Sequence, residues 1–278
     1  MSRIAILGLL VGLTAGCSRP GAVERAEWPV MGTVAAVQWR SGGEQAPNLA
    51  REMAAESFRE VENLLNAHNP DSELSRLAVL PEAEILAKCD VRMRPCYAAA
   101  FELAKASGGA FNPRWKGAQT LDLGAIAKGF AVDLAYGAIL RGAGASCPRL
   151  LIDLGGNLRA VGDEWTVGVL GADGTDFCRK VVLRPSEAVA TSATYYRGSH
   201  IRDGRTNRPV SNDVASVTVV ATTAMVADGL STTLFVLGPQ DGLGHVKSYG
   251  RDVVAVLWVM KDGRQVEYDP GGRLGRIR

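Results

Sequence analysis

One apolar stretch of the chain, from Thr222 to Leu237, carries a single charged side chain, Asp228. If this stretch is a helix, Asp228 shares one face with Ser231 and Thr232, which follow three and four residues later. A buried carboxylate is unfavourable unless it is paired or bound to a metal ion. One carboxylate and two hydroxyls form a patch of hard oxygen atoms, the ligands that Mg2+ or Ca2+ prefers. The alternative is an aspartate that caps the helix or pairs with a basic residue.

The first residues predict export from a bacterial cytoplasm. Arg3 precedes an apolar run, Ile4 to Leu13, that is too short to span a bilayer as a mature helix. Small residues then lead to Cys17, as in a lipobox. We expect a lipoprotein signal peptide over residues 1–16, lipidation of Cys17 and a lipidated tether over 17–27, with an ordinary secretory signal as the alternative. The protein is then expected in the cell envelope, lipid-anchored and facing the periplasm, at either the inner or the outer membrane.

Composition argues against two classes of function. The 278 residues include 31 basic and 29 acidic ones without a long block of one sign, so we expect no nucleic-acid partner. With three histidines and no Cys-x-x-Cys motif, a zinc site is not expected either. In an oxidising compartment, the four cysteines after Cys17 allow three disulfide pairings, of which the short loop favours Cys89–Cys96 together with Cys147–Cys178. Free buried thiols are the alternative.

The pattern of elements predicts an α+β fold for residues 28–278. Helices and strands mix without strict βα alternation, which disfavours a doubly wound parallel sheet. The region is long enough for one large domain or two intermeshed subdomains. Helices are predicted over residues 48–66, 97–106, 125–140 and 222–237, and strands over 34–39, 150–153, 166–170, 180–183, 188–191 and 214–221, followed by a hairpin of 252–260 with 265–268.

Glycines punctuate the start of the predicted helix over 125–140, in the segment Leu121 to Gly129. Free N–H groups and the positive end of the helix dipole suit a phosphate there, and Lys128 lies one turn inside. The alternative is a capped helix with a solvated lysine. The segment matches neither a Walker P-loop nor a Gly-x-Gly-x-x-Gly fingerprint.

The loop from His200 to Pro209 contains a histidine, an aspartate and three arginines. This composition suits acid–base chemistry beside an anionic substrate, because imidazole titrates near neutral pH. A solvated surface histidine is the alternative.

Eight short motifs follow one another in a distinctive order and spacing. They are Met-Gly-Thr at 31–33, Asn-Pro-Asp-Ser-Glu-Leu-Ser-Arg-Leu at 69–77, Gly-Ala-Phe-Asn-Pro at 109–113, Asp-Leu-Gly-Ala-Ile-Ala-Lys-Gly-Phe-Ala-Val-Asp at 122–133, Asp-Leu-Gly-Gly-Asn at 153–157, Ala-Thr-Ser at 190–192, His-Ile-Arg-Asp at 200–203 and Ala-Asp-Gly-Leu-Ser-Thr-Thr at 227–233. Together they resemble the FAD:protein FMN transferases of the ApbE family of bacterial lipoproteins. The resemblance runs from about Trp28 to Gly238.

This resemblance implies an ApbE-like, T-fold-related α+β fold, with mixed or antiparallel sheets, packed helices and a single catalytic domain over 28–278. It implies that the protein splits FAD at its pyrophosphate, attaches FMN to a serine or threonine hydroxyl of an exported partner protein, and releases AMP. Mg2+ is the implied cofactor.

The resemblance also assigns residues. The implied metal ligands are Asp228, Ser231, Thr232 and the backbone carbonyl of Ala125. The implied catalytic residues are Asp228 and His200, the latter as general base. The implied nucleotide contacts are Met31, His68, Ala110, Phe111, Asn112, Asp122, Lys128 and Arg202.

Three features depart from the family's pattern. Asn112 stands where aspartate is usual, the stretch between residues 111 and 122 is short, and Gly204 and Asn207 replace a proline and a glycine. An FAD pyrophosphatase that yields FMN and AMP, and a non-catalytic flavin-binding lipoprotein, are therefore the alternatives. In the short stretch, Trp115 is expected either to stack on a ring of the nucleotide or to pack at the surface.

Overall fold

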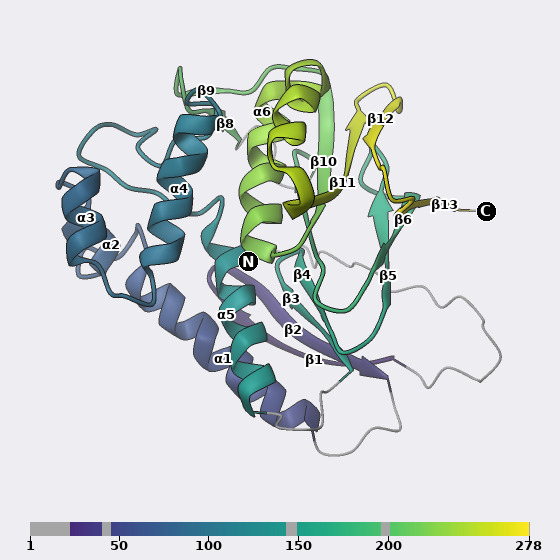
Figure 1. The fold of residues 1–278 in the computed structure, drawn as a ribbon, viewed down its shortest axis with the longest axis horizontal. Coiled ribbons are helices and arrows are strands. Elements are labelled where there is room, and N and C mark those ends of the chain that lie inside the picture. The colour runs from purple at the N-terminus through teal and green to yellow at the C-terminus, as the bar shows by residue number, and fades with distance from the viewer. Residues whose placement is uncertain (1–22, 41–45, 143–148, 196–200, 278) are drawn as a thin grey trace, which may run out of the picture.

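A computed structural model describes residues 23–40, 46–142, 149–195 and 201–277. These residues form an antiparallel eight-stranded sheet, a three-stranded sheet and a two-stranded hairpin, together with six α-helices (Figure 1). The α+β prediction, with antiparallel sheets and packed helices, is confirmed. No helix in the described ranges is long and apolar enough to cross a bilayer.

The large sheet has the strand order β1-β2-β3-β4-β7-β10-β11-β12. Its strands are β1 (Val23–Val30), β2 (Thr33–Arg40), β3 (Leu150–Leu154), β4 (Asn157–Val161), β7 (Ala188–Ala193), β10 (Val214–Ala221), β11 (Val253–Met260) and β12 (Gln265–Tyr268). The small sheet has the order β13 (Leu274–Arg276), β6 (Phe177–Leu183), β5 (Trp165–Leu170). A short hairpin pairs β8 (Arg202–Asp203) with β9 (Arg208–Pro209).

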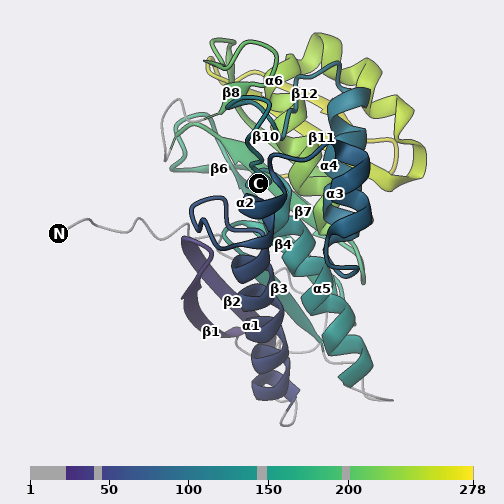
Figure 2. The same cartoon turned by 90° about the vertical axis from the view of Figure 1, so that its left-hand side faces the viewer.

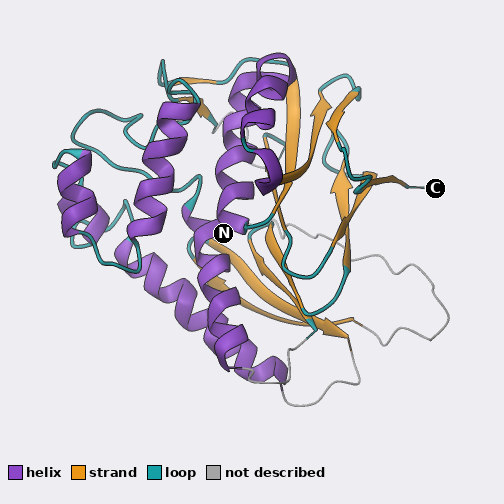
Figure 3. Cartoon of the chain, viewed as in Figure 1, coloured by secondary structure: helices purple, strands orange, loops and turns teal. Residues whose placement is uncertain are grey.

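Helices cover one face of the large sheet and the small sheet covers part of the other (Figure 3). The helices are α1 (Ala46–Leu64), α2 (Glu73–Leu77), α3 (Glu82–Lys88), α4 (Arg94–Ala106), α5 (Ala127–Gly142) and α6 (Ala224–Ser248). Turned by a quarter, the molecule shows α1 and α5 running along the sheet beside β1 to β3 (Figure 2). Because β10 is covered on both faces, all eight of its residues are buried, and all but Ser216 and Thr218 are apolar.

Helix α6 contains the apolar stretch that carries Asp228 as its single charge. Thr223 caps its start by accepting a hydrogen bond from the N–H of Val226 at 3.2 Å. The helical backbone breaks at Gly238, where φ is +69°, directly before Pro239. The predicted helix of 222–237 is therefore the first part of α6, and Asp228 lies inside it, 5% exposed.

Helices α5 and α6 meet at Gly129, where the two backbones approach closely. A Cβ atom at Gly129 would lie 2.2 Å from the carbonyl oxygen of Ala224 and 2.7 Å from Asp228 Cβ. The Gly129→Ala variant is expected to lose about 1 to 3 kcal/mol of unfolding free energy, because backbone atoms cannot make room locally. Gly137→Ala is the matched control on the same helix, since its Cβ would meet only the flexible end of Arg141. Urea unfolding measures both; equal stabilities would contradict the close approach.

Two predictions about the chain are corrected by the structure. The predicted tether over 17–27 is wrong for residues 23–27, which lie in β1 and pair with β2. The charged residues and Pro29 are atypical of a strand, so the sequence pattern did not predict β1. An edge strand tolerates both because one of its sides forms no hydrogen bonds with a neighbouring strand. Residues 1–22, including Cys17, lie outside the described ranges.

The predicted disulfide Cys89–Cys96 is wrong, because both residues are free thiols. Each packs into the hydrophobic core like a small apolar side chain, and burial raises the pKa of the Cys96 thiol far above its usual range. Cys178 is also free, and its predicted partner Cys147 lies outside the described residues.

Candidate active site

A cavity of about 630 Å³ opens between the two sheets and the ends of α5 and α6. Its walls come from the β1–β2 turn, the loop before α5, the β3–β4 turn, β5, β7, the β8–β9 hairpin and the first turns of α6. Asp122, Lys128, Asp228 and Thr232 all line it. The structure therefore brings together segments that are far apart in the sequence.

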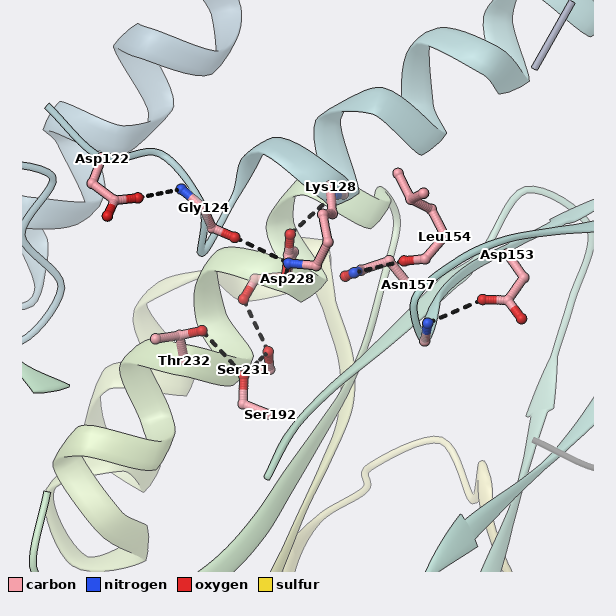
Figure 4. A network of polar contacts seen from close by, with 12 residues as sticks. Asp122, Gly124, Lys128, Asp153, Leu154, Asn157, Ser192, Asp228, Ser231 and Thr232 are labelled. Carbon is pink, nitrogen blue, oxygen red and sulfur yellow. Dashed lines mark hydrogen bonds and ion pairs between the residues drawn. The ribbon is translucent and has the colours of Figure 1, made fainter. Parts of the chain in front are cut away.

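The hydroxyl groups predicted on α6 meet a third hydroxyl, from β7. Ser192 Oγ lies 2.8 Å from Ser231 Oγ and 3.1 Å from Thr232 Oγ1. Ser231 also donates to the carbonyl oxygen of Asp228 at 2.9 Å. The result is a cluster of hydroxyl oxygens beside a buried carboxylate, defined by Ser192, Asp228, Ser231 and Thr232 and drawn in Figure 4. We call it the oxygen cluster.

The first turn of α5 supplies the partners of Asp228. Gly129 N–H donates to Asp228 Oδ2 at 2.9 Å, while Lys128 Nζ lies 3.8 Å from Oδ1 and donates to the carbonyl of Gly124 at 3.0 Å (Figure 4). The Lys128–Asp228 contact is longer than a hydrogen bond. Asp228 Oδ1 therefore keeps its capacity to bind a cation in the cavity.

The donor set of the oxygen cluster fits Mg2+. The described residues contain no group of three or more histidine, cysteine, aspartate or glutamate side chains that could hold a metal ion. Mg2+ needs no such cage, because it commonly binds through one or two carboxylates together with substrate phosphates. Asp228 would be the carboxylate, Thr232 and Ser192 the neighbouring hydroxyls, and Ala125 lines the same cavity.

A second polar group, around Asp122, lies at the other side of the start of α5. Asp122 Oδ1 accepts from Gly124 N–H at 3.0 Å, and Lys116 Nζ lies 3.0 Å from Oδ2. Burial raises the pKa of Asp122, but the hydrogen bond from Gly124 and the charge of Lys116 outweigh it and hold the pKa below its usual range. This carboxylate therefore stays ionised and holds the loop before α5 in place.

The ring of Trp115 makes cation–π contacts with two basic side chains. Lys116 Nζ is 4.7 Å and the Arg202 guanidinium 5.5 Å from the ring centroid. Trp115 and Arg202 both line the cavity. The ring thus lies at the cavity wall with two cation–π contacts, and its stacking on a ring of the nucleotide stays a prediction.

Two of the departures from the family's pattern touch each other. Asn112 Nδ2 donates to the carbonyl oxygen of Gly204 at 3.0 Å. A Cβ at Gly204 would lie 2.5 Å from Asn112 Cβ and 2.5 Å from the carbonyl oxygen of Gly109. Any residue larger than glycine at 204 would clash with the loop that carries Asn112, so the two departures fit one another.

Strands β3 and β4 place two further polar side chains at the cavity, Asp153 near the end of β3 and Asn157 at the start of β4. Asp153 Oδ1 accepts from Gly156 N–H at 3.0 Å, and Arg25 Nη2 lies 3.5 Å from Oδ2. Burial raises the pKa of Asp153 to about 6, although the Gly156 hydrogen bond and the Arg25 charge oppose this shift. Neither residue has a role predicted from the sequence.

The raised pKa of Asp153 predicts a pH dependence of stability. The folded protein holds this proton to higher pH than the unfolded chain does, so the stabilisation is complete below pH 3.8 and is lost as the pH rises through about 6. The loss amounts to about 3 kcal/mol, from roughly 2 pKa units. The Asp153→Asn variant has no titrating carboxyl at this position. Its free energy of unfolding should therefore fall less between pH 4 and pH 7 than the free energy of unfolding of the unaltered protein. Urea unfolding at each pH provides the measurement; parallel pH profiles would contradict the assignment.

Most of the predicted site residues meet at the cavity. Those that line it are Ala110, Phe111, Asn112, Asp122, Ala125, Lys128, Arg202, Asp228 and Thr232, and Ser231 joins them through its hydrogen bond to Ser192. Met31 and His68 do not line it. Met31 lies in the β1–β2 turn with φ of +50° and donates its N–H to Glu62, while His68 is exposed after α1. His200 lies outside the described residues.

Ser192 is the residue of the oxygen cluster that sequence reasoning missed. Its signal was present in the Ala-Thr-Ser motif at 190–192, but only the packing of β7 against α6 brings its hydroxyl to Ser231. A pattern of spacing within one helix cannot show a partner from a strand.

Comparison with known proteins extends these observations. The model of the ApbE family matches residues 31–118 and 114–258. The FAD:protein FMN transferase of Klebsiella pneumoniae (strain 342) is 33% identical over 152 residues, covering 51% of this chain and 46% of that protein. The FAD:protein FMN transferase of Rhodobacter capsulatus is 37% identical over 155 residues, covering 51% of this chain and 28% of that protein. The chain thus spans less than half the length of these two relatives.

Solved structures share the fold. The flavin transferase ApbE from Vibrio cholerae aligns with a TM-score of 0.72 at 23% identity, covering 90% of this chain and 97% of that one. The ApbE protein from Thermotoga maritima aligns with a TM-score of 0.74 at 22% identity, covering 88% of this chain and 96% of that one. With the family model matching most of residues 31–258 and the fold shared, the chain belongs to the ApbE family.

Proposed function

We propose that this protein transfers the FMN half of FAD to a serine or threonine hydroxyl of an exported partner protein, with Mg2+ as cofactor, and releases AMP. The names of its relatives, FAD:protein FMN transferase, support this activity. The observation that carries it is that the oxygen cluster, Lys128 and the start of α5 line one cavity. A motif around Cys17 supports the further proposal that a lipid anchors the protein at the periplasmic side of a membrane.

Phosphoryl transfer depends little on covalent catalysis by the protein. In phosphoryl transfer the bond from the acceptor oxygen to phosphorus forms while the bond from phosphorus to the AMP oxygen breaks, and the acceptor hydroxyl gives up its proton. Charge neutralisation and in-line positioning therefore decide the rate. When bound, Mg2+ would neutralise the pyrophosphate oxygens and polarise the phosphorus.

Different residues of the cavity would bind the cation, the phosphates and the rings of the nucleotide. Asp228, oriented by Gly129 N–H, would hold the cation, and Lys128 would place its ammonium beside the phosphate oxygens. Trp115, held by Arg202, offers an aromatic face to a ring of the nucleotide.

His200 is the proposed general base for the acceptor hydroxyl. It directly precedes Ile201, which is buried, and Arg202, which is exposed, and both line the cavity. The His200→Ala variant is expected to transfer flavin about 100-fold more slowly, the lower end of the usual contribution of a general base. Flavin transfer is followed by the mass of an acceptor peptide at pH 7, with FAD binding as the control. Near-normal transfer would reject the assignment.

One experiment separates the proposed transferase from its two alternatives. The purified protein is incubated with FAD, Mg2+ and an acceptor peptide, and both AMP and the peptide mass are measured. The transferase gives AMP together with a peptide heavier by FMN. AMP without a heavier peptide identifies an FAD pyrophosphatase, and the absence of both products identifies a flavin-binding protein without catalysis.

A further inference from the structure

One side chain at the cavity has a buried polar atom that the protein leaves without a partner. Asn157 begins β4, directly after the Gly155–Gly156 turn, and is 3% exposed. Its Nδ2 donates to the carbonyl oxygen of Leu154 at 3.1 Å. Its Oδ1 is buried and accepts no hydrogen bond from any residue in the described parts of the chain.

The hydrogen bond to Leu154 fixes the orientation of the amide. A carbonyl oxygen can only accept, so the group that faces it must be the NH2. Exchanging the two amide atoms would set two oxygens against each other and would still leave a buried atom unsatisfied. Oδ1 therefore lies on the side of the amide away from Leu154, at a cost of about 1 to 3 kcal/mol for a buried acceptor left without a donor.

The amide of Asn157 points toward Lys128 and toward Asp228, the carboxylate of the oxygen cluster (Figure 4). Asn157 lines the same cavity as Asp228 and Lys128, and in Figure 4 its amide end points toward these two residues rather than toward Asp153. The turn that carries Asn157 is held by the Asp153–Gly156 hydrogen bond of 3.0 Å. An acceptor of this kind, fixed in position and without a donor, indicates that a bound group completes its coordination.

We propose that Asn157 Oδ1 is a further oxygen of the cation site, binding the ion directly or through one bound water. Amide oxygens are ligands of the same hard type as the carboxylate and hydroxyls across the cavity. An uncharged ligand adds a contact without adding negative charge beside the phosphates of a nucleotide. The inference rests on the metal dependence in the proposed function.

Binding of Mn2+, measured by the loss of the free-ion electron paramagnetic resonance signal, tests this assignment on the purified full chain. Asn157→Leu is expected to raise the Kd for Mn2+ by about 10-fold or more, the usual effect of losing a supporting oxygen at a metal site. Asn157→Asp retains an oxygen and is expected to bind Mn2+ at least as tightly as the unaltered protein. Thermal unfolding without metal should change by only a few degrees in Asn157→Leu, because the unsatisfied acceptor is removed together with its amide.

Ser216→Ala is the matched control. Ser216 lies in β10 of the same sheet, is fully buried, and its Oγ also has no partner in the described residues, but it does not line the cavity. Its loss should leave the Kd for Mn2+ unchanged. Wild-type affinity in Asn157→Leu, or equal weakening in Ser216→Ala, would overturn the assignment of Asn157 alone. If the unaltered protein binds no Mn2+, the metal dependence of the proposed function fails as well.

Discussion

Replacing Asp228 with asparagine is expected to slow FMN transfer by about 1,000-fold, because the site loses the one carboxylate of the oxygen cluster and with it most of the attraction for a cation. The substitution keeps the shape of the side chain. It also keeps an oxygen that can accept the 2.9 Å hydrogen bond from Gly129 N–H. The contact between α5 and α6 should therefore survive.

Three measurements distinguish this effect from loss of folding. AMP release and the mass of the acceptor peptide report turnover, and thermal unfolding reports the fold. Asp153→Asn serves as the matched control, since it removes a buried carboxylate from another wall of the same cavity. Equal turnover in Asp228→Asn and the unaltered protein would show that catalysis does not need this carboxylate.

The second large effect is expected on stability, in Asp133→Ala. The Asp133 carboxylate accepts the N–H groups of Ala224 and Met225 at 2.8 and 2.9 Å, so it binds the start of α6. It also pairs with Arg159, whose guanidinium lies 3.8 Å from the ring centroid of Tyr136. Removing the carboxylate leaves two helix N–H groups without their acceptor and leaves a largely buried guanidinium without its counter-charge, although the guanidinium keeps its hydrogen bonds to the carbonyl oxygens of Ser186 and Thr222. The expected loss is about 3 to 5 kcal/mol of unfolding free energy.

Urea unfolding at pH 7 provides the measurement, and an exposed ion pair provides the comparison. Asp163 pairs with Arg40 where both side chains are about one-third exposed, so Asp163→Ala should cost less than about 1 kcal/mol. Similar losses in the two variants would mean that Asp133 contributes no more than a surface charge.

The parts of the site that the sequence predicts are those that depend on spacing within one element. Asp228, Ser231 and Thr232 share a face of α6 because helical geometry requires it. The start of α5 was predicted from its glycines, and the structure places Lys128 at the cavity as expected. These inferences need no knowledge of which elements pack together.

The parts that escape prediction depend on packing between elements. Ser192 reaches the oxygen cluster only because β7 lies against α6, and the contact of Asn112 with Gly204 joins two loops. Strand β1 was hidden because an edge strand may carry charges and proline without losing its ladder to β2. Short helices such as α2 and α3 lack the several turns over which a hydrophobic period can be recognised.

The walls of the cavity also set the moment at which the protein can first act. Gly32 near one end of the chain and Thr232 in α6 line the same space, with contributions from loops and strands between them. During synthesis no partial chain contains the complete cavity until α6 has emerged and docked on α5 through Gly129. A chain that is still unfolded would therefore have no working site, whichever compartment it is in.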